Sequence, residues 1–165
     1  MNPTHIHLVL NHFPIVGGII GFLILTWSTI SKNVALQKVA ATVLVFMAVL
    51  AIPVFLTGEP AEHAVERLPG ISESLIEAHE DAAKISFWLM MLTGVVALLA
   101  LFIKTKNRDF SKNLLLATLF VSIVSSGAMA YTGYTGGKIR HTEISGDQTG
   151  NPTMERGYER EKGDD

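Results

Sequence analysis

The chain has 165 residues, of which 48% are hydrophobic and only 17% are charged, and this composition indicates lipid rather than water as its solvent. The net charge of −2 gives no reason to expect a nucleic-acid partner. Cysteine is absent, which excludes disulfides, thiolate-bound iron–sulfur clusters and covalently attached c-type haem, so any haem here would be held without covalent links.

Four apolar runs, each free of Asp, Glu, Lys, Arg and His, follow one another along the chain. Each is close to the ~20 residues that a helix needs to cross ~30 Å of hydrocarbon. The runs lie at about 13–30, 39–57, 85–103 and 114–134. We therefore expect an all-α integral membrane four-helix bundle over residues 1–143. The polar tail 144–165 has too little apolar surface to offset its ordering entropy and is expected to be flexible.

The loops between these runs predict the orientation of the chain. With four spans, both termini and the long loop 58–84 lie on one side of the membrane. The short loops 31–38 and 104–113 lie on the other side, and they hold one acid, Asp109, against the basic residues Lys32, Lys38, Lys104, Lys106, Arg108 and Lys112. By the positive-inside rule the short loops face the cytoplasm. We expect a multi-pass protein of the bacterial inner membrane, with both termini and loop 58–84 in the periplasm.

Local signals refine these elements. Pro14 suits the first turn of a helix, where its missing N–H costs nothing. Gly17-x-x-x-Gly21 leaves a flat stripe that favours close helix packing. In the long loop, Ala61–Arg67 is expected to form a short helix, and Ser72 to begin a helix that continues unbroken into the third span. No internal repeat at a fixed period is apparent.

Histidines gather on the predicted outer side of the membrane. His5, His7 and His12 precede the first span, His63 follows the second, His79 precedes the third and His141 follows the fourth. Every span therefore has a histidine near its outer end. Neutral imidazole is the commonest protein ligand of zinc, copper and haem iron, and in bundles such ligands come from facing helices. We expect His12 to be a ligand, partnered by His79 or His141, and His5 to be a solvated surface residue.

Carboxylates offer a second kind of site on the same side. Mixed His/Glu ligation suits a metal centre whose strong signal is Glu-x-x-His, but the chain has the reversed order, His63-x-x-Glu66, and only once. The metal alternative therefore uses His12, His79, His63 and Glu66. No nucleophile has an adjacent base and no charged residue lies inside a span, so an electron carrier or a subunit is favoured over a stand-alone enzyme or a transporter.

The first span also carries a resemblance. His7 and His12, five residues apart and followed by Phe13-Pro14, are similar to the opening His-Pro-x-x-x-His-Phe-Pro of a family of small bacterial four-span membrane proteins catalogued as a domain of unknown function. On that match the recurrent histidines of the family correspond to His7, His12, His79 and His141. The chain departs from the family at Leu8, where the family usually has Pro, and in the shorter spacing from Gly136-Gly137 to His141. Some family members are joined to cytochrome-type domains, which implies a redox role.

Two hypotheses for the function follow. The first is a membrane cytochrome-like protein that holds one haem b near the outer face through two of His7, His12, His79 and His141, and passes electrons between quinone and a periplasmic redox protein. The second is a non-catalytic accessory subunit whose histidines hold zinc, copper or nothing. In both cases membrane lipid surrounds the protein.

Overall fold

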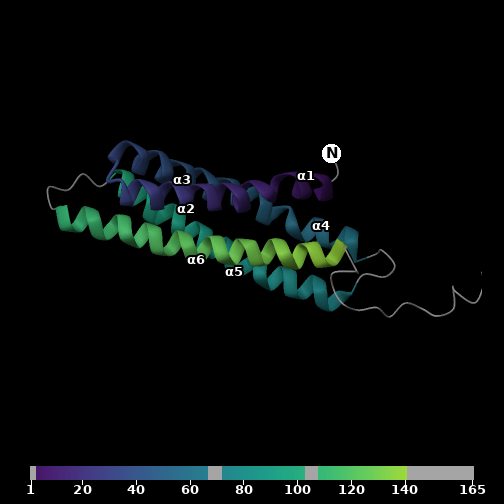
Figure 1. The fold of residues 1–165 in the computed structure, drawn as a ribbon. Coiled ribbons are helices and arrows are strands. Elements are labelled where there is room, and N and C mark those ends of the chain that lie inside the picture. Colours follow the sequence, from purple (N-terminus) through teal and green to yellow (C-terminus); the bar gives the residue numbers. More distant parts are fainter. Residues whose placement is uncertain (1–2, 67–71, 103–107, 141–165) are drawn as a thin grey trace, which may run out of the picture.

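The computed structural model describes residues 3–66, 72–102 and 108–140 (Figure 1). Within these ranges the chain is built from helices and turns and contains no strand. The helices are α1 (Pro3–Leu10), α2 (His12–Ile30), α3 (Val34–Leu56), α4 (Gly58–Val65), α5 (Glu73–Phe102) and α6 (Arg108–Arg140). The all-α prediction is confirmed. The tail 144–165 and His141 lie outside the described residues.

Four helical segments are long and apolar enough to cross a membrane, and they confirm the expected four-helix bundle. They are His5–Ile30, Val34–Ala64, Glu73–Phe102 and Lys112–Ile139. The helix that begins after Ser72 does run unbroken into the third span. The helix expected at Ala61–Arg67 is α4, which starts three residues earlier, at Gly58, and is separated from α3 only by Thr57.

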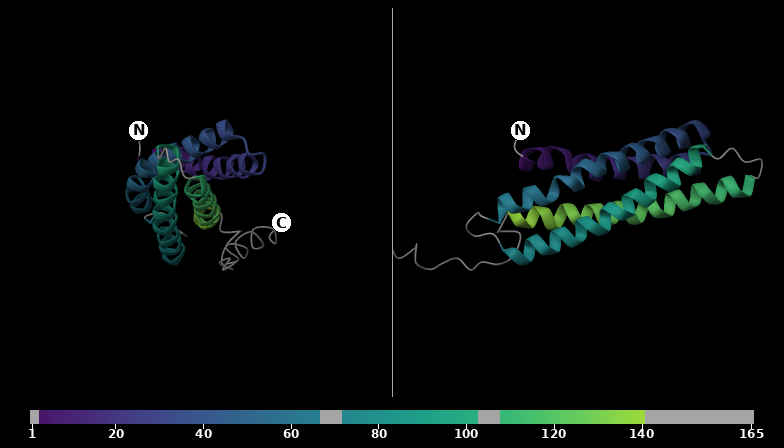
Figure 2. Two further views of the ribbon diagram at one scale, coloured as in Figure 1. Left: turned by 90° about the vertical axis from the view of Figure 1, so that its left-hand side faces the viewer. Right: turned by 180° about the vertical axis from the view of Figure 1, so that it is seen from behind.

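The long helices form a ring in which each packs on its neighbour in sequence. α2 packs on α3, α3 on α5, α5 on α6, and α6 returns to α2. Figures 1 and 2 show that α1, α4, the start of α5 and the end of α6 all lie at one end of the bundle. We call this end the histidine end, because His7, His63 and His79 lie on these segments. α1 packs mainly on α4 there.

Proline explains the break that separates α1 from α2. Pro14 lies in the first turn of α2, as expected, and is buried. Because it has no N–H, the carbonyl group of Leu10, four residues earlier, receives no hydrogen bond from it. α1 ends at Leu10, and the chain continues through Asn11 into α2. At the other end of the bundle, Asn33 caps α3 by accepting a hydrogen bond from the backbone N–H of Leu36 at 3.1 Å.

Glycines allow the helices to approach closely. A Cβ added at Gly21 would lie 2.8 Å from Leu44 Cδ2, and one added at Gly17 would overlap Met47, so the Gly17-x-x-x-Gly21 stripe of α2 faces α3. Likewise a Cβ added at Gly94 on α5 would overlap the Cβ of Ala48 on α3. The packing interpretation of this stripe is confirmed.

The bundle interior combines many small and hydroxyl-bearing side chains with a few large ones such as Leu25, Leu44 and Met90, whereas many other large apolar side chains face outward. Trp27, Trp88 and Phe120 are each at least 65% exposed. Small residues inside and large apolar residues outside are the arrangement that lipid favours, because hydrocarbon tails solvate the outer side chains while close helix packing stabilises the interior.

Buried positions recur in the two halves of the bundle with the same spacing. Adding 72 to the residue numbers of four buried residues of α2 gives the numbers of four buried residues of α5. Pro14, Gly18, Gly21 and Leu25 correspond to Ser86, Met90, Thr93 and Ala97. From 40 to 118 is a shift of 78 residues, and it maps α3 onto α6 in the same way. Ala40, Leu44, Met47 and Ala51 correspond to Thr118, Ser122, Ser125 and Met129.

These correspondences indicate an approximate twofold axis along the bundle. The axis carries α2 onto α5 and α3 onto α6, which agrees with the ring of contacts because it also carries the α3–α5 contact onto the α6–α2 contact. Membrane proteins made of two parallel repeats have this symmetry. No repeat of fixed period was expected from the sequence, and indeed the shift differs between the first and second helix of each half. We refer to α1–α3 as the N-terminal half and to α5–α6 as the C-terminal half.

Candidate functional site

His7 lies on α1 at the histidine end and is partly buried. Its Nδ1 lies 3.1 Å from the carbonyl oxygen of Val54 and 3.3 Å from Thr57 Oγ1. A carbonyl oxygen can only accept, so Nδ1 carries the proton and donates it to Val54. In the neutral ring this leaves the lone pair on Nε2, which is the atom that can bind a metal.

His79 makes the same contacts from the first turns of α5. Its Nδ1 lies 3.1 Å from the carbonyl oxygen of Thr132 and 3.1 Å from Thr135 Oγ1. By the same argument Nδ1 donates and Nε2 keeps its lone pair. No hydrogen bond to Nε2 of either histidine is found in the described part of the chain.

The twofold relation between the halves includes both histidines and everything that holds them. The shift of 72 takes His7 to His79, and the shift of 78 takes the contacts of one ring to those of the other. Val54, Thr57 and Gly58 become Thr132, Thr135 and Gly136. Gly58 and Gly136 both lie against the rings, since an added Cβ would be 3.7 Å from His7 Cε1 and 2.9 Å from His79 Cε1.

The threonine hydroxyls are themselves held in place. Thr57 Oγ1 lies 2.8 Å from the carbonyl oxygen of Pro53 and 3.0 Å from that of Val54, and Thr135 Oγ1 lies 3.0 Å from that of Thr132. Each hydroxyl therefore donates to the backbone of its own helix and turns a lone pair toward the neighbouring Nδ1–H. The arrangement sets both the tautomer and the orientation of each imidazole.

Asn11 is a polar residue of the N-terminal half that has no polar counterpart in the C-terminal half. It follows His7 by four residues, and its Oδ1 is buried without a hydrogen-bond partner among the described residues. The shift that relates the halves places Ala83 at the corresponding position of α5. A buried acceptor without a partner costs about 1–3 kcal/mol, so it is a place where a bound group could supply a donor.

His12 lies away from this pair. It is exposed, and its Nδ1 donates to the carbonyl oxygen of Leu8 at 3.1 Å, within its own stretch of chain. His12 precedes the buried Pro14 by two residues, and positions two apart face opposite sides of a helix. The twofold relation therefore matches His79 with His7, whereas the role of His12 as a ligand stays a prediction.

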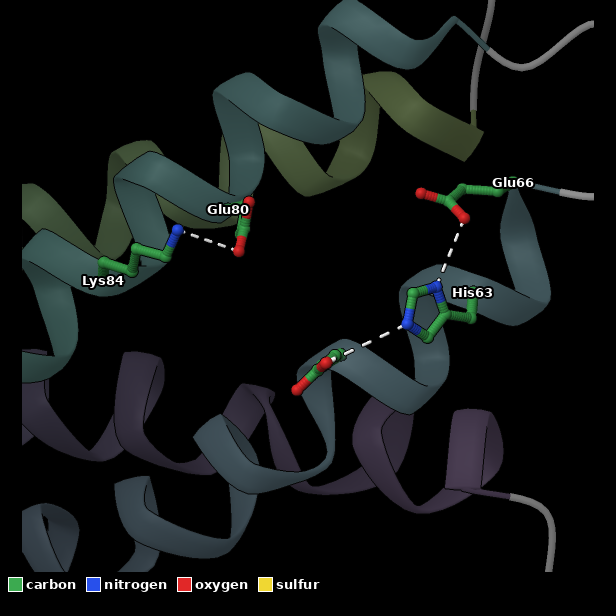
Figure 3. Close-up of polar contacts among 5 residues, drawn as sticks. His63, Glu66, Glu80 and Lys84 are labelled. Carbon is green, nitrogen blue, oxygen red and sulfur yellow. Dashed lines mark hydrogen bonds and ion pairs between the residues drawn. The ribbon is translucent and has the colours of Figure 1, made fainter.

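His63 on α4 and Glu66, the residue that follows α4, lie side by side, as Figure 3 shows. His63 Nδ1 lies 3.3 Å from Glu66 Oε2, and its Nε2 lies 3.9 Å from Glu59 Oε1. These side chains are largely exposed, and across from them Glu80 and Lys84 form an ion pair at 2.8 Å on α5. The contacts are those of a solvated helix surface, where ion pairs contribute little stability.

A centre built from several histidines and carboxylates is not assembled in the described part of the chain. No group of three or more His, Cys, Asp or Glu side chains is placed to hold a metal ion there. His12, His79, His63 and Glu66 therefore do not form one cluster. His5 is exposed, as expected, and a role for His141 stays a prediction because that residue lies outside the described ranges.

The residues that the sequence reasoning missed are those that hold the two rings. Val54, Thr57, Thr132 and Thr135 lie within apolar runs, where a threonine or a backbone carbonyl has no distinctive pattern. One signal was present, because a Thr-Gly pair ends the second span, Thr57-Gly58, and another ends the fourth, Thr135-Gly136. A shared Thr-Gly pair at matching ends of two spans could have indicated the twofold relation.

Comparison with known proteins identifies a family without an assigned activity. The model of a family described as predicted membrane protein (DUF2231) matches residues 3–144. No curated protein and no solved structure matches the chain.

Proposed function

The chain belongs to this family of membrane proteins, and from that premise we propose that it is a cytochrome-like electron carrier that binds one haem b between His7 and His79. The observation that carries the proposal is the twofold-related pair of imidazoles, each donating Nδ1–H to a backbone carbonyl group and leaving Nε2 with a lone pair. Histidine ligands of metals are commonly held by such a second hydrogen bond, which fixes the tautomer and raises the basicity of the ligand.

The number of ligands favours haem over a bare metal ion. Zinc and copper sites usually take three or four protein ligands, and no group of three His, Cys, Asp or Glu side chains converges within the described ranges. Haem iron needs only two, because the porphyrin supplies the other four nitrogen atoms.

A haem held by both His7 and His79 would have no free coordination position for oxygen, so the chemistry that it would supply is electron transfer rather than oxygen activation. The protein's part is to hold the two rings from separate halves and to keep them neutral. We propose that quinone in the membrane and a periplasmic redox protein are the two electron-transfer partners.

The proposed orientation places the histidine end outside the cytoplasm. The opposite end carries the basic loops 31–38 and 104–113, and the positive-inside rule assigns such loops to the cytoplasm. In this orientation the cofactor lies near the periplasmic face of the bacterial inner membrane, within reach of a periplasmic partner.

The test is the absorption spectrum and iron content of the full-length protein purified after expression with a haem precursor. We expect a Soret band, the spectrum of six-coordinate iron with two imidazole ligands, and about one iron per chain. His7→Ala and His79→Ala should each abolish that spectrum, since each removes one of the two ligands. His12→Ala and His63→Ala are the matched controls and should keep it.

Three outcomes contradict the proposal. The haem assignment is excluded by a colourless preparation whose spectrum is unchanged on adding haemin. Stoichiometric zinc or copper in place of iron supports the accessory-subunit hypothesis. Loss of the spectrum in His12→Ala with retention in His7→Ala contradicts the pairing.

A further inference from the structure

A pocket of about 300 Å³ lies on the outer surface of the bundle between α5 and α6. Its apolar lining comes from three alanines and one isoleucine, Ala78, Ala82, Ala128 and Ile85. Its polar lining is Asp81, Ser86 and Tyr131. The volume is at the lower end of the ~300–1,000 Å³ range of small-molecule sites, which suits a single substituted ring.

The inner wall of this pocket is hydrogen-bonded to the candidate cofactor site. Ser86 Oγ lies 2.7 Å from Thr132 Oγ1, and the carbonyl oxygen of Thr132 accepts the Nδ1–H of His79. Thr132 Oγ1 in turn donates to the carbonyl oxygen of Ala128 at 3.1 Å. The Ser86 hydroxyl therefore donates to Thr132, and its lone pairs can accept a hydrogen bond from the pocket.

The pocket also lies at the edge of the hydrocarbon layer. Ile85 is the first residue of the third apolar run and is 61% exposed, and Tyr131, in the last turn of the fourth run, is 58% exposed. Asp81 stands one turn before Ile85, in the charged segment outside the run. The pocket would therefore open toward lipid. The apolar part of a ligand in it would contact the alanines, and the polar atoms of the ligand would lie near water.

We propose that this pocket binds the headgroup of a membrane quinol, which enters from the bilayer. The proposal rests on the proposed function, because it places the electron donor beside the His79 ligand of the haem. The flat ring would lie on the three alanines, one quinol hydroxyl would donate to Ser86 Oγ, and another would donate to the Asp81 carboxylate. A lipid acyl chain in the pocket would form no hydrogen bond with Ser86 or Asp81.

The redox balance is that of stepwise quinol oxidation. The quinol loses two electrons and two protons and becomes quinone. The electrons would pass one at a time to the haem held by His7 and His79 and from there to the periplasmic redox protein, which is the oxidant. The Asp81 carboxylate would accept the protons one at a time, one with each electron, and would release the first to water on the outer side before the second hydroxyl turns toward it.

The experiment measures reduction of the haem-loaded, full-length protein in lipid nanodiscs by a short-chain ubiquinol. Ala78→Phe should fill the pocket and slow reduction by about tenfold or more, a change equivalent to one decade in binding. Reduction by dithionite, which needs no pocket, should be unchanged. Ala130→Phe is the matched control, because Ala130 is exposed on α6 and does not line the pocket. Asp81→Asn should also slow the quinol reaction, because the proton acceptor is lost.

Reduction of Ala78→Phe at the normal rate overturns the proposal and leaves the pocket to lipid. A preparation without haem overturns the proposed function instead, and the pocket is then tested on its own through quenching of Trp88 fluorescence by the oxidised quinone. Saturable quenching that Ala78→Phe abolishes supports the pocket, and quenching equal in the two proteins refutes it. Trp88 is suitable because it is exposed and lies one turn from Ile85, which lines the pocket.

Discussion

The two halves of the bundle bury the same positions with different side chains. The N-terminal half fills them with glycine, alanine, leucine and methionine, whereas the C-terminal half fills many of them with serine and threonine. At the histidine end the difference disappears, because each half presents a histidine, a threonine hydroxyl and a glycine in the same relation. The shared spacing of the buried positions is therefore enough for the two halves to pack alike. The same residue types recur in both halves only where the two histidine rings are held.

The buried hydroxyls of the C-terminal half are compatible with lipid because they have hydrogen-bond partners, several of them within the same helix. Thr93 donates to the carbonyl oxygen of Leu89 at 2.8 Å, Thr118 to that of Leu114 at 2.9 Å, and Ser122 to that of Leu119 at 2.8 Å. Small side chains that satisfy their own hydroxyls let helices pack closely without leaving a polar group unpaired.

The glycines beside the rings are expected to show the largest difference between the halves. In Gly136→Ala the new Cβ would lie 2.9 Å from His79 Cε1 and 3.2 Å from Nδ1, so the ring must move and the bound cofactor should be lost. In Gly58→Ala the nearest ring atom is 3.7 Å away, an ordinary contact, so cofactor should be retained. The ratio of Soret to protein absorbance in the two purified variants measures this. Equal loss in both would show that the clearance at Gly58 is as tight as at Gly136.

The threonines test whether the two halves support their ligands equally. Thr57→Val and Thr135→Val remove the hydroxyl that receives each Nδ1–H, and loss of such a contact typically weakens metal binding by about 10–100-fold. The two variants should weaken haemin binding similarly in a titration of the haem-free protein, and serine at either position should restore it. Thr93→Val, in which the lost hydroxyl contacts only its own helix, is the control. A normal affinity in both valine variants would remove the positioning role.

Packing between the halves is probed at Gly94. In Gly94→Ala the new methyl group would overlap the Cβ of Ala48, and overpacking of this kind typically costs about 1–3 kcal/mol. Gly127→Ala meets nothing within 4 Å and should be neutral. Thermal unfolding in detergent compares the two, and unchanged stability of Gly94→Ala would mean that α3 and α5 can separate at little cost.

Asn11 is expected to have the smallest effect on the folded, cofactor-free protein. Asn11→Leu removes a buried oxygen that has no partner among the described residues, and such replacements are nearly neutral or stabilising. Haem with ionised propionates has no hydrogen-bond donor for this oxygen, so haemin binding should also change little. A clear loss of stability in the cofactor-free variant would instead reveal a partner for Asn11 within the protein.

The sequence predicted the bundle well because length and hydropathy decide it. The four runs, the short helix after the second span and the long helix starting after Ser72 all depend on local composition. The choice between His7 and His12 depends on how the first helix is rotated about its axis. In lipid an apolar helix has no polar face to indicate that rotation, and only the small residues Gly18 and Gly21, which share a face with His7, carried the information.

The twofold relation was hidden for a different reason. The corresponding residues differ in type, such as Gly18 with Met90 or Leu44 with Ser122, and the shift changes from 72 to 78 between helices. A comparison of residue types between the two halves therefore finds no repeat, whereas the positions of the buried residues show the twofold relation. The Val54 and Thr132 carbonyl groups could not be predicted at all, because any residue supplies a carbonyl oxygen and only the fold determines which one meets a ring.

Each histidine is held entirely by its own half, since His7 bonds to α3 and His79 to α6. A group that binds both rings would therefore link the two halves, each of which already holds its histidine in a fixed orientation. Its binding energy would be added to the association of the halves, by about 2.7 kcal/mol at a hundredfold excess over the dissociation constant. The chain would then be a covalently joined dimer whose final closure depends on its ligand, and fragments divided between α4 and α5 would assemble best when that ligand is present.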